Sequence, residues 1–312
     1  MELPKVEGPH DGRDISYNYF YKQCEDLNEI EEGIPVSSFT NLSKMRNKDL
    51  EFRLMRKITE TKKHMEFLVQ NTPKLQGLNR YSDILPFQDT IVSLESGDYI
   101  NADWIKHPMP DHKLFIATQG PLESTRDSFW RMIWEYNVSL IVMISAIREA
   151  GKVKCDQYFP IGDSIELPNF VITLVSSETP FPSITARVFQ ITHKATMETR
   201  TVSHLQSVAW PDHGTPELED EFDSIDYLLN SLESHKEKHV VIHCSAGIGR
   251  TGTLIALFQM VQTIKLMKED ARISVFGTVR RLREQRWGMV QTKDQYDFLY
   301  RFMDEWINKY HN

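Results

Sequence analysis

The sequence predicts an α/β protein in which helices pack around a β-sheet. Before about residue 75 the apolar pattern is mostly helical, and after residue 80 short apolar runs of strand length follow one another. Because helical patterns interrupt these runs, a sheet covered by helices is the expected arrangement. The strand-like runs are 91–94, 99–105, 115–117, 140–144, 170–176, 186–191, 202–209 and 240–243, and the helical patterns between them are 123–134, 219–232, 254–267, 274–286 and 293–309.

The first part of the chain predicts a helical lead-in to a single larger unit. Residues 1–15 are polar, and the following segment to about residue 74 places Phe52, Met55 and Ile58 at helical spacing. No internal repeat and no Gly/Ser-rich linker divides the rest of the chain. We therefore expect an N-terminal helical lead-in over residues 1–50 and one domain of catalytic size over residues 51–312.

Composition and charge exclude several classes of function. The 312 residues carry 36 Lys and Arg against 44 Asp and Glu, a net charge of −8, which disfavours nucleic acid and anionic membrane lipids as partners. With only Cys24, Cys155 and Cys244, a disulfide framework or a zinc site is not expected, and neither is a metal or another cofactor. The N-terminus lacks the apolar run of a signal peptide, and no apolar run is long enough to span a membrane. These features predict a cytoplasmic protein.

The most informative segment reads as a strand, a tight loop and a helix over residues 240–253. Backbone N–H groups that point into such a loop, at the N-terminus of a helix, form an anion site. Gly247 and Gly249 allow the backbone to turn inward, Cys244 opens the loop, and Arg250 closes it with a planar group that can hold two phosphoryl oxygens. A thiol in this setting ionises more readily than a free thiol, so it can act as a nucleophile without a separate base.

A Cys and an Arg six residues apart form a weak motif, and a lone Cys at the end of a strand is more often a small buried side chain. The complete block His243–Gly252, however, resembles the signature of the protein tyrosine phosphatases, the tyrosine-specific branch of the cysteine-based phosphatases. Further blocks agree with that family in order and spacing over about residues 77–300; they are 79–81, 98–102, 115–121, 129–135, 149–160, 210–214 and 291–296. The resemblance is to the non-receptor, single-domain type. It implies a central, highly twisted mixed sheet flanked by helices, with the phosphate cradle between a strand and a helix N-terminus.

The resemblance also implies roles for individual residues. Cys244 is expected to be the nucleophile of a cysteinyl-phosphate intermediate, and Asp212 the general acid and then the general base. Gln291 is expected to position the attacking water, and Thr251 to donate a hydrogen bond to the sulfur. Arg250 and the loop backbone are expected to hold the phosphoryl oxygens. The loop residues expected to bind substrate are Ser245, Ala246, Gly247, Ile248 and Gly249.

Further residues are expected to select the substrate or support the site. Tyr81 is expected to form an aromatic wall that favours a phosphorylated ring, Asp83 to hold backbone N–H groups of the substrate, and Gln295 to assist Gln291. For Tyr81 and Gln295 a purely structural role stays open. The supporting residues are Glu149, expected to pair with Arg250 or Lys154; Lys154 itself; His243, as a tuning or a structural histidine; and Arg286, at the pocket floor, as a partner of Asp212, or as a solvated helix end.

The sequence therefore predicts an enzyme that hydrolyses phosphotyrosine in proteins. Two alternatives stay open: a dual-specificity or lipid phosphatase with a shallower pocket, and a non-catalytic phosphotyrosine-binding module. The expected partners are phosphotyrosyl proteins and, as inhibitors, phosphate or oxyanions such as vanadate; a monomer is expected. Leu78 and Trp104 depart from the family pattern and are expected to alter the rim of the pocket.

Overall fold

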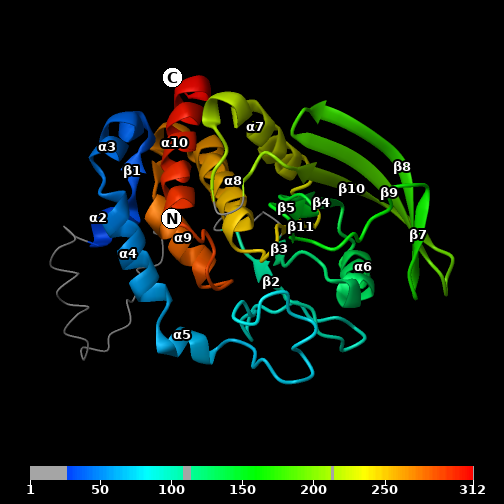
Figure 1. The fold of residues 1–312 in the computed structure, drawn as a ribbon. Helices are drawn as coiled ribbons and strands as arrows, with labels where there is room; N and C mark the ends of the chain where they lie inside the picture. Colours follow the sequence, from blue (N-terminus) through cyan, green and yellow to red (C-terminus); the bar gives the residue numbers. More distant parts are fainter. Residues whose placement is uncertain (1–26, 108–113, 212–213, 312) are drawn as a thin grey trace.

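An eight-stranded mixed sheet forms the centre of the computed structural model, which describes residues 27–107, 114–211 and 214–311 (Figure 1). In spatial order the strands are β2 (Ala102–Ile105), β3 (Phe115–Thr118), β11 (Val240–His243), β4 (Leu140–Met143), β10 (Thr199–Ser207), β9 (Ile184–His193), β8 (Phe170–Phe181) and β7 (Ser164–Glu166). The four strands from β3 to β10 are parallel to their neighbours within that group, and the remaining pairs are antiparallel. The mixed sheet that the sequence predicted is confirmed.

Side chains alternate between two apolar layers along the central strands. In β11, Val240 and Ile242 join the larger core, whereas Val241 joins the smaller one. The larger core is covered by α7 (Leu218–Ser234), α8 (Gly249–Met267), α9 (Val275–Arg283) and α10 (Lys293–Tyr310). The smaller core is covered by α6 (Arg126–Glu135), on the opposite side of the sheet from these helices. Because side chains of a strand point alternately to its two faces, β11 and β4 are buried on both sides.

The segment before the sheet packs onto the C-terminal helices. It contains α2 (Leu27–Glu32), β1 (Ile34–Pro35), α3 (Phe39–Met45), α4 (Lys48–Thr59) and α5 (Lys62–Glu66), and β1 pairs with β12 (Arg272–Ile273). Phe39, Leu54 and Met55 are fully buried in the larger core. Figure 1 shows α3 and α4 beside α10. Helix α4 continues across residue 50, where the sequence predicted the end of the lead-in.

The five helical patterns predicted after residue 120 all form helices, but one predicted strand is wrong. Residues 91–94 make only an isolated bridge from Ile91 to Asp103. Strands β8 and β9 also extend beyond the predicted ranges, because their far ends form an exposed hairpin that no apolar pattern marks. The remaining short elements are η1 (Val36–Ser38), η2 (Glu123–Thr125), η3 (Lys268–Asp270), β5 (Arg148–Glu149) and β6 (Lys152–Val153).

Candidate active site

The loop between β11 and α8 turns back on itself at the N-terminus of a 19-residue helix. Gly247 has φ +73°, and a Cβ on it would lie 2.1 Å from the carbonyl oxygen of Thr118, so the close approach to β3 requires glycine. Cys244 follows the last strand residue and is almost fully buried. The predicted order of strand, tight loop and helix is confirmed. The structure therefore places a cysteine at the helix end where partial positive charge accumulates.

A pocket of about 120 Å³ opens at this loop. Its lining residues come from three segments of the chain: Tyr81, Asp83, Ile84, Cys244, Ser245, Ala246, Gly249, Arg250, Gln291 and Gln295. All except Ile84 belong to the residues that the sequence singled out. The segments are far apart in sequence, so their convergence on one pocket is a result of the fold.

Arg250 is held by a carboxylate at the edge of the pocket. Its Nη1 and Nη2 donate to Oε1 and Oε2 of Glu149, each at 2.6 Å, and Nη1 also donates to the carbonyl of Ile144 at 3.1 Å. This two-pronged geometry fixes the plane of the guanidinium. Of the two partners expected for Glu149, the structure shows Arg250.

Arg286 lies behind the loop and not at the pocket floor. Its side chain is fully buried, and it donates to the carbonyls of Gly247 at 2.9 Å and Ala246 at 3.0 Å. It also pairs with Asp103 at 2.5 Å and donates to Asn101 at 2.8 Å. Burial raises the pKa of Asp103 to about 6, against the attraction of Arg286. The expectation that Arg286 lines the pocket or solvates a helix end is wrong, because its side chain is buried and binds the loop carbonyls from inside. Its expected contact with Asp212 involves a residue outside those that the structure describes.

The sequence did not identify Asn101 and Asp103 as parts of the site. Both are buried between apolar residues: Asn101 lies just before β2, and Asp103 is its second residue. A carboxylate within a run of strand character is the signal that could have found Asp103, because buried carboxylates are paired.

His243 holds the backbone of the cysteine itself. Its Nδ1 lies 3.0 Å from the carbonyl oxygen of Cys244, and its Nε2 lies 2.8 Å from the hydroxyl of Tyr158. Burial lowers the pKa of His243 to about 4, so the ring is neutral near pH 7. The side chain is thus part of the support of the loop.

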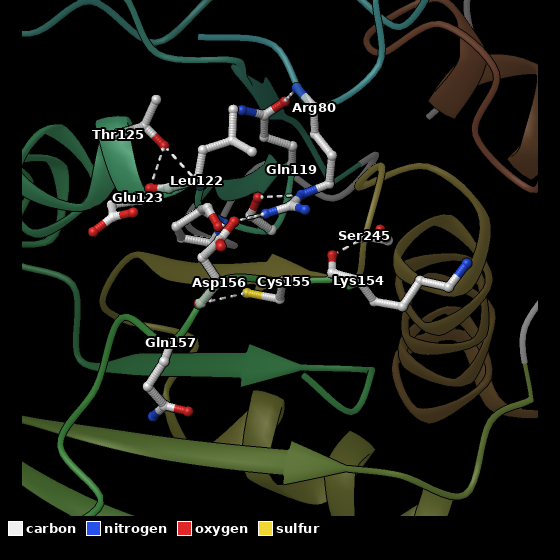
Figure 2. Close-up of polar contacts among 12 residues, drawn as sticks. Arg80, Gln119, Leu122, Glu123, Thr125, Lys154, Cys155, Asp156, Gln157 and Ser245 are labelled. Carbon is white, nitrogen blue, oxygen red and sulfur yellow. Dashed lines mark hydrogen bonds and ion pairs between the residues drawn. The ribbon is translucent and has the colours of Figure 1, made fainter. Parts of the chain in front are cut away.

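The pocket wall is tied to the loop through one hydroxyl. Tyr81 and Ser245 are hydrogen-bonded at 3.0 Å through their side-chain oxygens, and the Ser245 hydroxyl also donates to the carbonyl of Lys154 at 2.7 Å (Figure 2). In this network Lys154 contacts Ser245 through its backbone carbonyl. Tyr81, Ser245 and Lys154 therefore join three separate loops around the pocket.

Arg80 fastens the same wall to the body of the protein. Its guanidinium donates to the carbonyls of Gly120 at 3.0 Å and Pro121 at 2.7 Å and forms an ion pair with Asp156 at 2.7 Å (Figure 2). Its backbone N–H donates to the side chain of Gln119 at 2.8 Å. The sequence placed Arg80 in a family motif but assigned it no role; its four contacts fix the position of the adjacent Tyr81.

The two predicted glutamines differ in their surroundings. Gln295 is buried and its Oε1 accepts from the backbone N–H groups of Gln291 and Thr292 at the start of α10, so it caps the helix while it lines the pocket. Gln291 is exposed at the pocket. Thr251 is fully buried, and its hydroxyl has no hydrogen-bond partner within the described ranges. Asp212, the expected general acid, lies outside the residues that the structure describes.

Other expectations concern residues near the pocket. Trp104 packs edge-on against Tyr136 and His239, and neither it nor Leu78 lines the pocket. Their expected effect on the rim is not supported. Burial raises the pKa of Cys155 to about 12, and its thiol donates to the carbonyl of Asp156.

The described part of the chain contains neither a cluster of metal ligands nor a membrane-spanning helix. No group of three or more His, Cys, Asp or Glu side chains there could hold a metal ion. No helix there is both long and apolar enough to cross a membrane.

Comparison with known proteins agrees with this geometry. The family model described as protein-tyrosine phosphatase matches residues 76–305. Human tyrosine-protein phosphatase non-receptor type 20 is 41% identical over 248 residues, which cover 78% of this chain and 58% of that protein. Chicken receptor-type tyrosine-protein phosphatase eta is 37% identical over 279 residues, covering 85% of this chain but only 19% of that protein. The chain thus spans less than two thirds of the length of these relatives.

A solved structure is similar over nearly its whole length. The crystal structure of the catalytic domain of human protein tyrosine phosphatase non-receptor type 18 superposes with a TM-score of 0.76 at 30% identity, covering 86% of this chain and 99% of that domain. The same relative has been solved in complex with phosphopeptides of HER2, with a TM-score of 0.77 to this chain at 29% identity, covering 86% of this chain and 98% of that one. On the family match and this likeness, the chain belongs to the protein-tyrosine phosphatase family.

Proposed function

We propose that the protein hydrolyses phosphotyrosine in proteins through a cysteinyl-phosphate intermediate. The observation that carries the proposal is the position of Cys244, which lies in a pocket at the N-terminus of α8 with Arg250 on the same pocket wall. Helix N-terminal N–H groups and a guanidinium both stabilise a thiolate and the oxygens of a phosphoryl group. This arrangement supplies a nucleophile and a charge-stabilising site for phosphoryl transfer.

The reaction proceeds in two displacements. In the first, the Cys244 sulfur forms a bond to phosphorus while the bond to the tyrosine oxygen breaks, and Asp212 gives its proton to that oxygen. In the second, water attacks phosphorus, Asp212 takes up a proton from it, and the phosphorus–sulfur bond breaks to release phosphate and the thiolate. Gln291 orients the water, Thr251 donates to the returning sulfur, and Arg250 holds the phosphoryl oxygens in both steps.

Selectivity for phosphotyrosine is proposed to come from the wall that Tyr81 forms. An aromatic side chain packs well against a flat ring, and its hydroxyl is held by Ser245. Asp83 lies at the mouth, where its carboxylate can accept from backbone N–H groups of a peptide. The complex of the type 18 relative with HER2 phosphopeptides supports a peptide substrate.

The setting follows from the same chemistry. We propose a cytoplasmic enzyme, because a nucleophilic thiol needs a reducing compartment. Residues 51–312 are proposed to act as one catalytic domain and as a monomer, with residues 1–50 as the lead-in. Phosphate and vanadate are expected to inhibit by occupying the anion site, and neither nucleic acid nor membrane lipid is expected to bind.

The test compares three substrates in the presence of a chelator. A phosphotyrosyl peptide is expected to be hydrolysed much faster than the matching phosphothreonyl peptide or a phosphoinositide, and Cys244→Ser is expected to abolish turnover. Asp212→Ala is expected to lower turnover and keep substrate bound. Cys155→Ser, which changes a buried thiol outside the pocket lining, is the matched control and should keep turnover. Turnover by Cys244→Ser would overturn the proposal, and a preference for phosphoinositide would favour the lipid phosphatase.

A further inference from the structure

A buried chain of side chains links the surface of the sheet to the backbone of Cys244. Arg187 on β9 lies with Nη1 3.5 Å from Nδ1 of His204 on β10. His204 Nε2 lies 2.8 Å from the hydroxyl of Tyr158, and that hydroxyl lies 2.8 Å from Nε2 of His243. His243 Nδ1 lies 3.0 Å from the carbonyl oxygen of Cys244. The three inner side chains are fully buried, and Arg187 is half-buried at the outer end.

The protons in this chain can be assigned from its inner end. The carbonyl of Cys244 can only accept, so His243 carries its proton on Nδ1 and accepts at Nε2. The single proton of Tyr158 therefore points to His243, and its oxygen accepts from His204, which carries its proton on Nε2. Nδ1 of His204 is left as an acceptor that faces the guanidinium of Arg187. Burial lowers the pKa of both histidines, to about 4 for His243 and well below the usual value for His204, in agreement with neutral rings.

Every link therefore donates in one direction, from the cation of Arg187 toward the nucleophile. A hydrogen bond to a carbonyl draws electron density from its peptide group, and chained hydrogen bonds polarise one another. The carbonyl of Cys244 belongs to the same peptide as the N–H of Ser245, a residue that lines the pocket. Polarising this peptide makes the N–H a stronger donor to an anion beside it.

We propose that Arg187, His204 and Tyr158 are positioning residues that act through His243 to favour the thiolate of Cys244. This inference rests on the proposed function, in which that thiolate is the nucleophile. None of the three residues lines the pocket.

The charge of Arg187 is well placed for this role. It has no ion pair with a carboxylate of the described residues; instead its guanidinium lies 4.8 Å from the centre of the Phe159 ring and donates to Gln206 at 3.1 Å. A cation over an aromatic ring keeps its full charge, so its field acts along the hydrogen-bonded chain.

Other ionisable groups also surround the thiol and the chain, and they remain unchanged in the test. Arg250 and Glu149 lie on one side of Cys244, Asp83 lies across the pocket, and Arg286 lies behind the loop. In addition to burial, the charge of Arg80 lowers the pKa of His243, and Cys155 raises the pKa of Tyr158. Lys154 contacts Ser245 through its carbonyl.

The test measures how the rate of alkylation of Cys244 by iodoacetamide depends on pH, with the modified residue identified by mass spectrometry. Arg187→Met removes the cation and keeps the aliphatic stem over Phe159. It is expected to shift the midpoint of the pH profile upward by roughly half a unit, so that alkylation on the acid side slows about threefold. Arg187→Lys is expected to restore part of the shift.

Arg200→Met is the matched control. Arg200, on β10, also lies over an aromatic ring, at 3.9 Å from the centre of Trp134. It forms no hydrogen bond with the described residues of the hydrogen-bonded series from Arg187 to His243, so its substitution should leave the midpoint of the pH profile unchanged. Tyr158→Phe breaks both central bonds and is expected to shift the midpoint at least as far as Arg187→Met. Because both act through one chain, the double variant is expected to shift it no further than Tyr158→Phe alone.

Two results would overturn the inference: an unchanged midpoint in Arg187→Met, or additive shifts in the double variant. Melting temperatures identify any variant that fails to fold. If Tyr158→Phe does not fold, Arg187→Met still tests the inference, because Arg187 is only half-buried and its substitution is expected to leave the protein folded. Alkylation needs no turnover, so the result is independent of the proposed function. An enzyme that hydrolyses phosphotyrosine with an unchanged midpoint in Arg187→Met would retain the function and lose only this inference.

Discussion

Two buried networks hold the phosphate loop from behind, one charged and one neutral. The charged network is the Arg286–Asp103 pair, which binds the carbonyls of Ala246 and Gly247. The neutral network is the pair of histidines with Tyr158, which binds the carbonyl of Cys244. Both place their donors on backbone carbonyls of the loop.

The two networks meet the cost of burial differently. A buried guanidinium needs a carboxylate, and the structure supplies Asp103 beside Arg286. A buried imidazole avoids that need because it can stay neutral, with one nitrogen donating and the other accepting. The comparison teaches that loop rigidity can be obtained either by a compensated charge or by an ordered relay of neutral groups. Removing one partner of the charged network should therefore lower the free energy of unfolding strongly, whereas the neutral network should lose stability gradually as pH falls.

The largest effect is expected from breaking the charged pair. Arg286→Met leaves a fully buried carboxyl at Asp103 without its cation, and this is expected to lower the free energy of unfolding by about 3–5 kcal/mol. The carboxyl, whose pKa is already raised to about 6, would then take up a proton more readily. Urea unfolding at pH 7 measures the loss. The double variant Arg286→Met with Asp103→Leu should recover part of it, and a loss below about 1 kcal/mol in the single variant would refute the account of this network.

The neutral network is expected to lose stability as pH falls. In the unfolded chain His204 gains a proton below about pH 6.5, whereas in the folded protein its pKa is depressed well below that value. Folding stability is therefore full above pH 6.5 and declines below it, by about 2 kcal/mol for one such histidine between pH 7 and pH 5.

His204→Gln tests this contribution. Urea unfolding at pH 7 and pH 5 should show a decline about 2 kcal/mol smaller in the variant than in the wild type. Asp103 works in the opposite direction, because its folded-state pKa is raised, but it is present in both proteins and cancels in the difference. Equal declines in the two proteins would contradict a neutral, buried His204.

The smallest effect is expected at the pocket edge, where Glu149 pairs with Arg250. Unlike the charged network, this pair does not lie behind the loop. Glu149→Gln keeps one oxygen for Arg250 but removes the charge that fixes both nitrogens. We expect kcat/KM on a phosphotyrosyl peptide to fall about tenfold, equivalent to about 1.4 kcal/mol of transition-state stabilisation. Glu123→Gln, at an exposed ion pair with Arg126, is the control and should have no effect. A kcat/KM equal to that of the wild type would exclude Glu149 as a support for Arg250.

The sequence predicted well the parts of the site that are contiguous in the chain. The strand, the loop and the helix that form the cradle are adjacent, so apolar patterning and two glycines were enough to define them. The partners of the loop were not predictable, because they come from distant positions: Asp103 is 183 residues from Arg286, and Tyr158 is 85 residues from His243.

The predicted strand at 91–94 failed for a related reason. Val92 and Leu94 pack into the smaller core, and the segment meets the edge strand β2 at the single bridge from Ile91 to Asp103. An apolar pattern alone does not distinguish such a segment from a strand.

The central claim is that the cradle makes Cys244 the acceptor of the phosphoryl group. Rapid quenching with a phosphotyrosyl peptide labelled on phosphorus, followed by mapping of the protein-bound label, tests it directly. We predict that the label appears during turnover on Cys244 and is absent from Cys244→Ser. Label on another residue, or turnover with no covalent label at any quench time while product is still forming, would contradict the account.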